Sequence, residues 1–268
     1  MRTAKLPRAY ARPRRLVRCS QMRLLPLLLV LAACGPDPAT PDAPPPLPLP
    51  PGRVVETDSL LRDEPARTYR VAIGYPQIRA TDGEPLPVAL RAANAAVRDT
   101  VAAFADDLRP EAPPPGADPP DYPVEADGRT DRVWLSDDVF STLVEVYVYT
   151  GGAHGATYFV PITVDLVTGA PVAPADLFDA GMPWADTLAA HVGRGIRSRI
   201  RPTDVFATDG LDNIREGRVD LTLSPDSLTV HVPAGQVSSF AAGSFHIAVP
   251  RAAVEAFVRP GGLLARDR

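Results

Sequence analysis

Hydrophobic residues recur with two different periods between residues 68 and 108. Over residues 68–78 apolar and polar residues alternate, which predicts a half-buried strand. Over residues 87–108 apolar residues recur every three or four positions, which predicts a helix with one apolar stripe. Asn94 is the polar residue on that stripe, and we expect its amide to bond a neighbouring backbone, as buried amides usually do.

The middle of the chain returns to the alternating pattern of strands. Residues 110–131 are rich in proline and acidic residues, which is typical of a loop. Three strands are then predicted, at 132–135, 139–150 and 157–166. Pro161 lacks a backbone donor, so the strand that contains it should lie at a sheet edge or carry a bulge.

The last third of the chain predicts helices mixed with hairpin strands. A helix is expected over 183–200, a hairpin from 219–223 and 228–232, a strand over 244–249 and a short helix over 252–258. Residues 261–268 are expected to form a frayed tail. Strands grouped by hairpin links and interrupted by a few helices indicate an α+β fold. We therefore predict a mainly antiparallel sheet with two longer helices and one short helix.

The amino-terminal region carries the pattern of an export signal. A single basic residue precedes an apolar run from Leu24 to Leu31, and two alanines then lead to Cys34. This order is typical of a bacterial lipoprotein signal, in which the cysteine is acylated after cleavage. The run is shorter than the ~20 residues that a membrane-spanning helix needs. We expect residues 1–33 to be a cleaved signal peptide, with Met22 as an alternative start; the competing interpretation is an ordinary secretory signal.

A lipid on Cys34 would place the protein in the cell envelope, facing the periplasm or the exterior. Gly35 follows where inner-membrane lipoproteins commonly have Asp, so an outer membrane is favoured if the cell has one. Residues 35–52 contain nine prolines among eighteen residues and favour an extended polyproline segment. Residues 34–52 are therefore expected to be the lipidated cysteine and a proline-rich stalk.

The charge of the chain without its signal limits its partners. Residues 34–268 hold 20 basic and 32 acidic residues, a net charge of −12 with neutral histidines. Such a surface repels nucleic acid and attracts cationic partners over long range. A genome rich in GC codons or a salty habitat would produce the same composition. Cys34 is the only cysteine in this part, so a disulfide is excluded and the core must stabilise the fold.

His154 is the first candidate for chemistry. Gly151 and Gly152 precede it and Gly155 follows, so a flexible turn could present the imidazole to a ligand or metal. The alternative is that the glycines only form the turn and the ring bonds to a backbone carbonyl. A metal site that combines His154 with Asp165 and Asp176 is imaginable across a sheet, but the spacing does not require it. We predict no metal.

Other catalytic and binding motifs are missing from the sequence. The chain has no GxSxG run, and its one remaining cysteine is committed to lipid. Neither the phosphate-binding GxxxxGK[ST] nor GxGxxG occurs, so neither a nucleotide nor another cofactor is expected.

Several stretches resemble a known family of extracytoplasmic proteins. Residues 146–154 (VYVYTGGAH), 163–169 (TVDLVTG) and 175–178 (ADLF) resemble the C-terminal domain of the RsiV type, and 228–232 and 245–250 fit its end. That domain is a strand, a GGAH turn, a strand ending in Asp-x-x-Thr-Gly and an acidic-Leu-Phe turn. The segment YPQI at 75–78 and the helix with Asn94 are similar to the domain of unknown function that precedes it in RsiV and in the deacetylase PdaC.

The resemblance implies two non-catalytic modules outside the cytoplasm. Residues 53–142 would form the PdaC-like N-terminal domain and 143–260 the RsiV-like C-terminal domain. The candidate ligand-binding or signature turn would then be Gly151, Gly152, Ala153 and His154, with Asp165 on the following strand. The chain departs from both relatives, since it has no recognisable sigma-binding segment and no deacetylase domain. Gly155 also stands where the family often has proline.

We therefore expect a lipid-anchored binding or sensing module of the cell envelope without catalysis. Its ligand would be peptidoglycan or a cationic wall-acting protein such as lysozyme, which the RsiV ectodomain binds. The alternative is a peptidoglycan-modifying hydrolase that uses His154 with a nearby carboxylate. A structural lipoprotein without a ligand is the third hypothesis.

Overall fold

A computed structural model of the protein describes residues 49–114, 116, 118, 122–205 and 208–267, and these belong to one compact unit. The predicted signal peptide, Cys34 and nearly all of the stalk lie outside the described residues. Along the described ranges no helix has the length and apolar character needed to cross a membrane.

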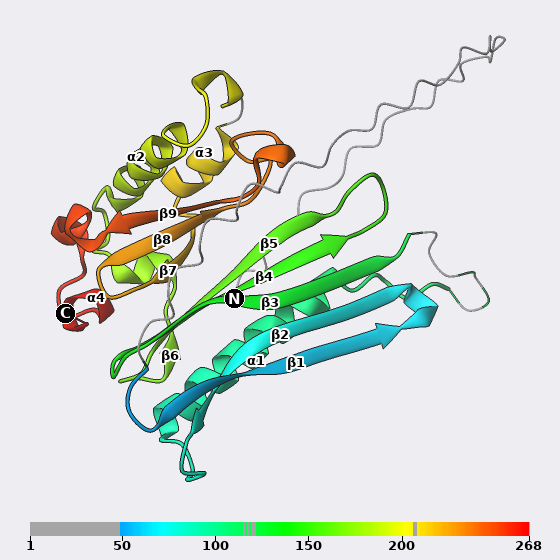
Figure 1. The fold of residues 1–268 in the computed structure, drawn as a ribbon, viewed down its shortest axis with the longest axis horizontal. Helices are drawn as coiled ribbons and strands as arrows, with labels where there is room; N and C mark the ends of the chain where they lie inside the picture. Colours follow the sequence, from blue (N-terminus) through cyan, green and yellow to red (C-terminus); the bar gives the residue numbers. More distant parts are fainter. Residues whose placement is uncertain (1–48, 115, 117, 119–121, 206–207, 268) are drawn as a thin grey trace, which may run out of the picture. The chain divides into compact units, whose positions relative to one another are not determined.

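The larger of two sheets has six strands that lie side by side in chain order (Figure 1). They are β1 (Arg53–Glu64), β2 (Tyr69–Ala80), β3 (Val124–Leu135), β4 (Val139–Tyr149), β5 (Ala156–Asp165) and β6 (Ala170–Pro171). Neighbouring strands are antiparallel except β2 and β3, which are parallel. The chain reaches β3 from β2 through helix α1 (Val88–Leu108), because parallel neighbours need a crossover connection.

Helix α1 covers one face of this sheet and confirms the helix predicted over 87–108. Its fully buried apolar residues recur every four positions, at Ala93, Val97, Val101 and Ala105. They pack against alternate residues of β2, β4 and β5 in one apolar cluster. The buried stripe of α1 is therefore displaced slightly around the helix from the predicted one. Phe104 lies at the side of the buried stripe, and its ring is 6.0 Å from that of Tyr158.

Asn94 bonds the backbone of β2 from within the α1 stripe, as the sequence predicts. Its Oδ1 accepts from the amide of Ile78 at 2.8 Å, and its Nδ2 donates to the carbonyl of Ile78 at 2.9 Å. Strand β3 pairs with β2 only along Tyr69–Ile73. The side chain therefore satisfies two buried backbone groups that lie past the end of this strand pairing.

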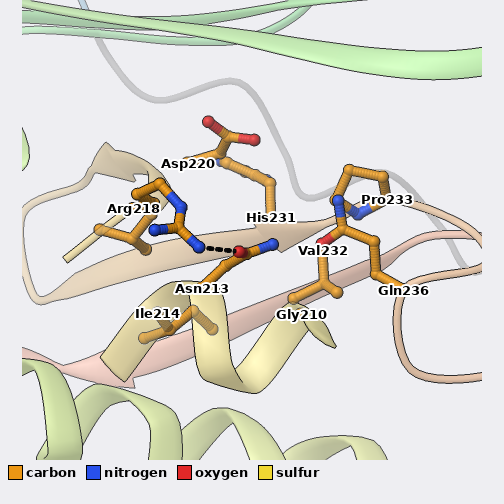
Figure 2. A pocket seen from close by; sticks show the side chains of 10 residues that line it. Gly210, Asn213, Ile214, Arg218, Asp220, His231, Val232, Pro233 and Gln236 are labelled. Atoms are coloured by element: carbon orange, nitrogen blue, oxygen red, sulfur yellow. Dashed lines mark hydrogen bonds between the residues drawn. The ribbon is translucent and has the colours of Figure 1, made fainter. Parts of the chain in front are cut away.

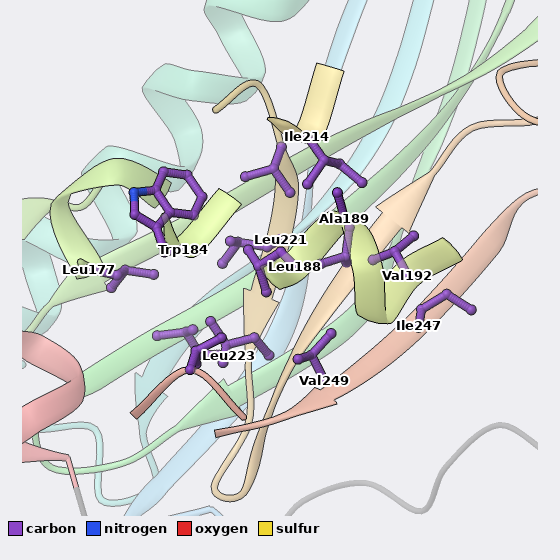
Figure 3. Close-up of a cluster of buried hydrophobic side chains, with 14 of the residues drawn as sticks. Leu177, Trp184, Leu188, Ala189, Val192, Ile214, Leu221, Leu223, Ile247 and Val249 are labelled. Atoms are coloured by element: carbon purple, nitrogen blue, oxygen red, sulfur yellow. The ribbon is translucent and has the colours of Figure 1, made fainter. Parts of the chain in front are cut away.

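The smaller sheet contains the antiparallel strands β7 (Asp220–Leu223), β8 (Ser227–Val232) and β9 (Phe245–Pro250). One of its faces is apolar and packs on helices α2 (Trp184–Arg197) and α3 (Asp209–Arg215). Figure 3 shows Leu188 and Val192 of α2 against strand residues such as Leu221 and Ile247. This alternation of buried leucine, valine and isoleucine is what made the hairpin predictable.

The two sheets meet along β4, β5 and β7. The backbone amide of Leu223 donates to Ser141 Oγ at 2.9 Å, and Ser141 Oγ lies 3.0 Å from Thr163 Oγ1. Phe159 of β5 lies against the rings of His231 and His246 on the smaller sheet. The second face of the smaller sheet is thus covered by the larger one at its β5 side.

The predicted α+β class with mainly antiparallel sheets is confirmed, and so are the strands 139–150 and 157–166, the hairpin and the helix near 183–200. Pro161 lies where β5 has no strand on its outer side, since β6 pairs only with Val164 and Asp165. The boundary expected between 142 and 143 falls inside the continuous strand β4.

Three expectations were wrong, and two elements were not predicted. The loop predicted to 131 ends earlier, because β3 begins at Val124, and the helix predicted over 252–258 is a pair of 3₁₀ turns, Arg251–Ala253 and Glu255–Phe257. Strand β1 and helix α3 were not predicted as elements; β1 is mostly exposed, so it lacks an apolar alternation. The tail is not frayed, because α4 (Leu263–Arg266) buries both leucines. Other 3₁₀ turns lie at Pro65–Arg67, Pro174–Leu177, Pro202–Asp204 and Phe240–Ala242.

Asn94→Ala is expected to lower the free energy of unfolding by about 2–4 kcal/mol, because two buried backbone groups lose their partner. Arg98→Ala on the exposed side of the same helix is the control and should change it by less than about 0.5 kcal/mol. Chemical denaturation followed by circular dichroism measures both. Equal losses in the two variants would contradict the role assigned to Asn94.

Candidate functional site

The predicted signature turn lies at the exposed tip between β4 and β5. Gly151 and Gly152 have φ angles of 84° and 105°, which favour glycine. The amide of Gly155 donates to the hydroxyl of Tyr147 at 2.9 Å, so the backbone approaches this ring closely. A Cβ at Gly155 would lie 2.4 Å from the carbonyl oxygen of Val148. The glycines are therefore required by the shape of the turn itself.

His154 is exposed on this turn, and so is Ala153. The imidazole Nδ1 lies 2.9 Å from the carbonyl oxygen of Gly155, and the ring lies 4.6 Å from that of Phe240. Phe240 belongs to the loop between β8 and β9. Within the described residues no carboxylate is hydrogen-bonded or ion-paired to His154, so the ring has a backbone acceptor and an aromatic neighbour.

Asp165 has a structural environment away from His154. Its Oδ1 accepts from the amides of Val167 at 2.9 Å and Thr168 at 3.3 Å, which forms the turn after β5. Its Oδ2 bonds Arg266 of α4 at 2.5 Å. Burial raises the pKa of Asp165, but the bonds from Arg266 and the two amides outweigh burial, so this pKa lies below its ordinary value. Asp176 likewise accepts from the amide of Ala173 at 3.3 Å.

The structure brings other titratable residues together between the two sheets. His231 of β8 and His246 of β9 are opposite each other, and their Nδ1 atoms are 2.7 Å apart. The Nε2 of His231 lies 2.9 Å from Thr222 Oγ1 on β7. Because two nitrogens at this distance share one proton, one ring donates and the other accepts.

Both imidazoles of this pair are biased toward the neutral form. Burial, the neighbouring His246 and then Arg132 hold the pKa of His231 well below its usual range. Burial and Arg132 also lower the pKa of His246. His191 stands apart on α2, where burial lowers its pKa, and it makes no described bond or ring contact with the other histidines.

Asp220 lies directly opposite His231 in the β7–β8 pair. Among the described residues no hydrogen bond or ion pair reaches its carboxylate. Burial raises the pKa of Asp220 to about 6, because no donor compensates the lost water. Figure 2 shows the carboxylate turned away from the Arg218 guanidinium, which instead donates to Asn213 Oδ1 at 2.6 Å.

Two pockets share Asp220 as a wall residue. The first has a volume of about 270 Å³ and lies between α3 and strands β7 and β8, with Asn213, Arg218, His231 and Gln236 as its polar lining (Figure 2). The second has a volume of about 240 Å³ and lies between β5, residues 172–177 and β7. Asp220 is thus an unpaired carboxylate at the junction of two hollows.

Asp220 and the histidine pair were not predicted as site residues from the sequence. In Val219–Leu223 and in 228–232 the polar residues alternate with buried apolar ones, which predicts a polar face toward solvent. Here that face is covered in part by the larger sheet. No signal in the local alternation distinguishes these two arrangements. Across the described ranges no three His, Cys, Asp or Glu side chains are grouped so that they could hold a metal.

Comparison with known proteins finds two solved structures that align with this chain. No family model matches this chain, and no curated protein does. Among solved structures, a member of the duf3298 family from Bacteroides fragilis aligns with 15% identity and a TM-score of 0.44, over 77% of this chain and 94% of that chain. A DUF3298 family protein from Pseudomonas aeruginosa aligns with 15% identity and a TM-score of 0.43, over 80% and 95%. The RsiV-type and PdaC-like resemblance stays a prediction.

Asp220→Asn is expected to raise the free energy of unfolding at pH 7.5 by about 2–3 kcal/mol, since the folded pKa is about 6 against an ordinary 3.8. The folded state binds the proton more tightly, so the wild-type chain loses stability as the pH rises from about 4 to 6. The gain from the substitution should therefore mostly vanish at pH 4.

Urea denaturation of both proteins across this pH range measures the difference. Asp226→Asn in the exposed turn of the same hairpin is the matched control and should show no such pH-dependent gain. A gain from Asp220→Asn that is the same at pH 4 and pH 7.5 would contradict the assigned burial.

Proposed function

We propose that the protein is a lipid-anchored binding module of the cell envelope that does not catalyse a reaction. Lipid on Cys34 would hold it at a membrane, and the proline-rich stalk would carry the folded part away from the surface. Its partner would be a cationic protein that acts on the wall, such as lysozyme. Peptidoglycan is the other ligand of this hypothesis.

The observation that carries the proposal is an uncovered half of the larger sheet, on the side opposite α1. Register places Asp63 opposite Arg70, Glu125 opposite Tyr149, Asp127 opposite Tyr147, and Arg129 opposite Glu145. Paired residues of antiparallel strands project from the same side of a sheet. We call this surface the open face; it comprises Leu61, Asp63, Arg70, Glu125, Asp127, Arg129, Glu145, Tyr147 and Tyr149.

The open face combines negative charge with accessible apolar surface. It holds four carboxylates and two guanidinium groups, and the nearest pair across it, Arg129 and Glu145, is 3.8 Å apart. Tyr147 is 49% exposed and Leu61 is 69% exposed. Large side chains that remain this exposed on a flat sheet provide contact area for a partner.

These two properties favour a basic protein over other envelope ligands. Carboxylates steer a cationic surface to the sheet, and tyrosine rings contribute binding energy once water is excluded. A surface of this kind needs no titratable group to change its proton during binding. The proposal therefore does not depend on His154.

The alternative function, a peptidoglycan-modifying hydrolase that uses His154, has less support. A general base needs a partner that orients it, and the described contacts of His154 are a backbone carbonyl and the Phe240 ring. If this alternative were right, the protein would act on peptidoglycan fragments, and His154→Ala would remove that activity while the fold stayed intact.

The full-length protein is expected to bind lysozyme more tightly at about 50 mM than at about 150 mM salt, because exposed charges are screened. Neutralising Glu125, Asp127 and Glu145 together as Gln, Asn and Gln should weaken binding by at least about tenfold at the lower salt. Calorimetric titration measures both effects.

The control carries the same change in net charge on the other side of the sheet, with Asp99, Asp106 and Asp107 of α1 changed to Asn. It should weaken binding by less than about threefold. Equal losses would show a general effect of charge and not the open face. If lysozyme does not bind at either salt concentration, this partner is wrong.

A further inference from the structure

The second pocket beside Asp220 has the chemistry of a site for a primary amine. Its walls are mainly apolar, from Pro161, Val172, Pro174, Leu177 and Leu221, with Thr163 and Asp220 as its polar members. An alkylammonium ion matches this lining, because its methylene groups pack on apolar side chains while its charged end needs acceptors.

The carboxylate of Asp220 is available at this site to accept hydrogen bonds from an ammonium group. The half-buried carboxylate of Asp220 has no hydrogen bond or ion pair from any described residue, although the residue lies opposite His231 in the sheet. Thr163 adds a hydroxyl, whose oxygen lies 3.0 Å from Ser141 Oγ. A carboxylate away from water is costly unless a cation or donors compensate it.

Among the described residues, Arg218 is the one cation that lines either pocket, and its charge is already compensated. Arg218 lines the first pocket, but its guanidinium bonds Asn213 and is ion-paired with Glu216. The charge of Arg218 is therefore compensated by its own neighbours, and the carboxylate of Asp220 has no described cation as a partner. The volume of about 240 Å³ lies below the range typical of drug-sized ligands, so a small aliphatic chain fits better than a sugar chain.

We propose that Asp220 and the pocket between β5, residues 172–177 and β7 bind a primary alkylammonium group. The methylene chain lies between Pro161, Val172 and Pro174, and the ammonium ion pairs with Asp220. The group is supplied either by a free small amine or by a lysine side chain of a protein. This site is separate from the open face and does not depend on it.

Titration of the full-length protein with pentylammonium at pH 7.5 tests the proposal, with 1-pentanol as the uncharged ligand of the same length. The amine is expected to bind at least about tenfold more tightly than the alcohol, because only the amine compensates the carboxylate. Asp220→Asn should remove this preference, while Asp226→Asn should keep it. Calorimetry gives the affinities, and chemical shifts of the Val219–Leu221 amides give the location.

The pH dependence separates binding from a structural effect. With a pKa of about 6 for Asp220, about a tenth of the carboxylate is ionised at pH 5, so amine binding should weaken about tenfold between pH 7.5 and 5. Among the described residues, the other charged or titratable groups that line the two pockets are Arg218 and His231. A pH dependence that persists in Asp220→Asn would belong to these groups and would overturn the proposal, as would equal affinity for amine and alcohol.

A second arm identifies the source of the amine. If Asp220→Asn abolishes the binding of pentylammonium but not that of lysozyme, the site binds a free small amine. If Asp220→Asn abolishes the binding of both, the site binds a lysine side chain of the partner. Either result supports the pocket, and a failure of lysozyme to bind the wild-type protein leaves the amine titration as a complete test.

Discussion

The arrangement of the two sheets depends on a hydrogen bond to the hydroxyl of Ser141. It accepts the amide of Leu223 from the smaller sheet and lies within hydrogen-bond distance of Thr163 in its own sheet. A serine on the covered face of β4 thus takes the place of a strand neighbour for the first strand of the hairpin. This bond brings a polar face of the smaller sheet against the larger one, where most folds place an apolar layer.

The histidine pair and Asp220 lie at this polar contact between the sheets. His231 is buried and His246 is half-buried beside Phe159, so both rings are held toward the neutral form. Asp220 lies in the same layer but at its edge, where it borders two pockets and has no described partner. An apolar layer between the two sheets would be more stable. The polar layer instead leaves the carboxylate of Asp220 able to bind a ligand.

The sequence predicts the elements that depend on a local pattern. It does not predict the burial of residues when a distant element packs against the second face of a strand. The α1 helix, the hairpin and the Asn94 bond follow from period and polarity, and the structure confirms them. Strand β1 has a single buried residue, so its sequence shows no alternation of apolar and polar positions. Asp220 and His231 follow the pattern of solvent-facing positions, and only the packing of a distant strand makes His231 buried and Asp220 half-buried. The glycine turn was predicted as an element, while the contacts of His154 needed the loop with Phe240.

Asn94 also determines how the larger sheet can end. Beyond Ile73 the free side of β2 is closed by a helix side chain and by α1 itself, so a strand from another molecule has no hydrogen-bonding groups to reach at Ile78. On this side of the sheet the edge strand is β1, which carries Glu56, Asp58 and Arg62 among other charged residues. Charged edge strands oppose pairing between copies. The charges of β1 therefore disfavour the pairing of this one edge with a second copy of the chain.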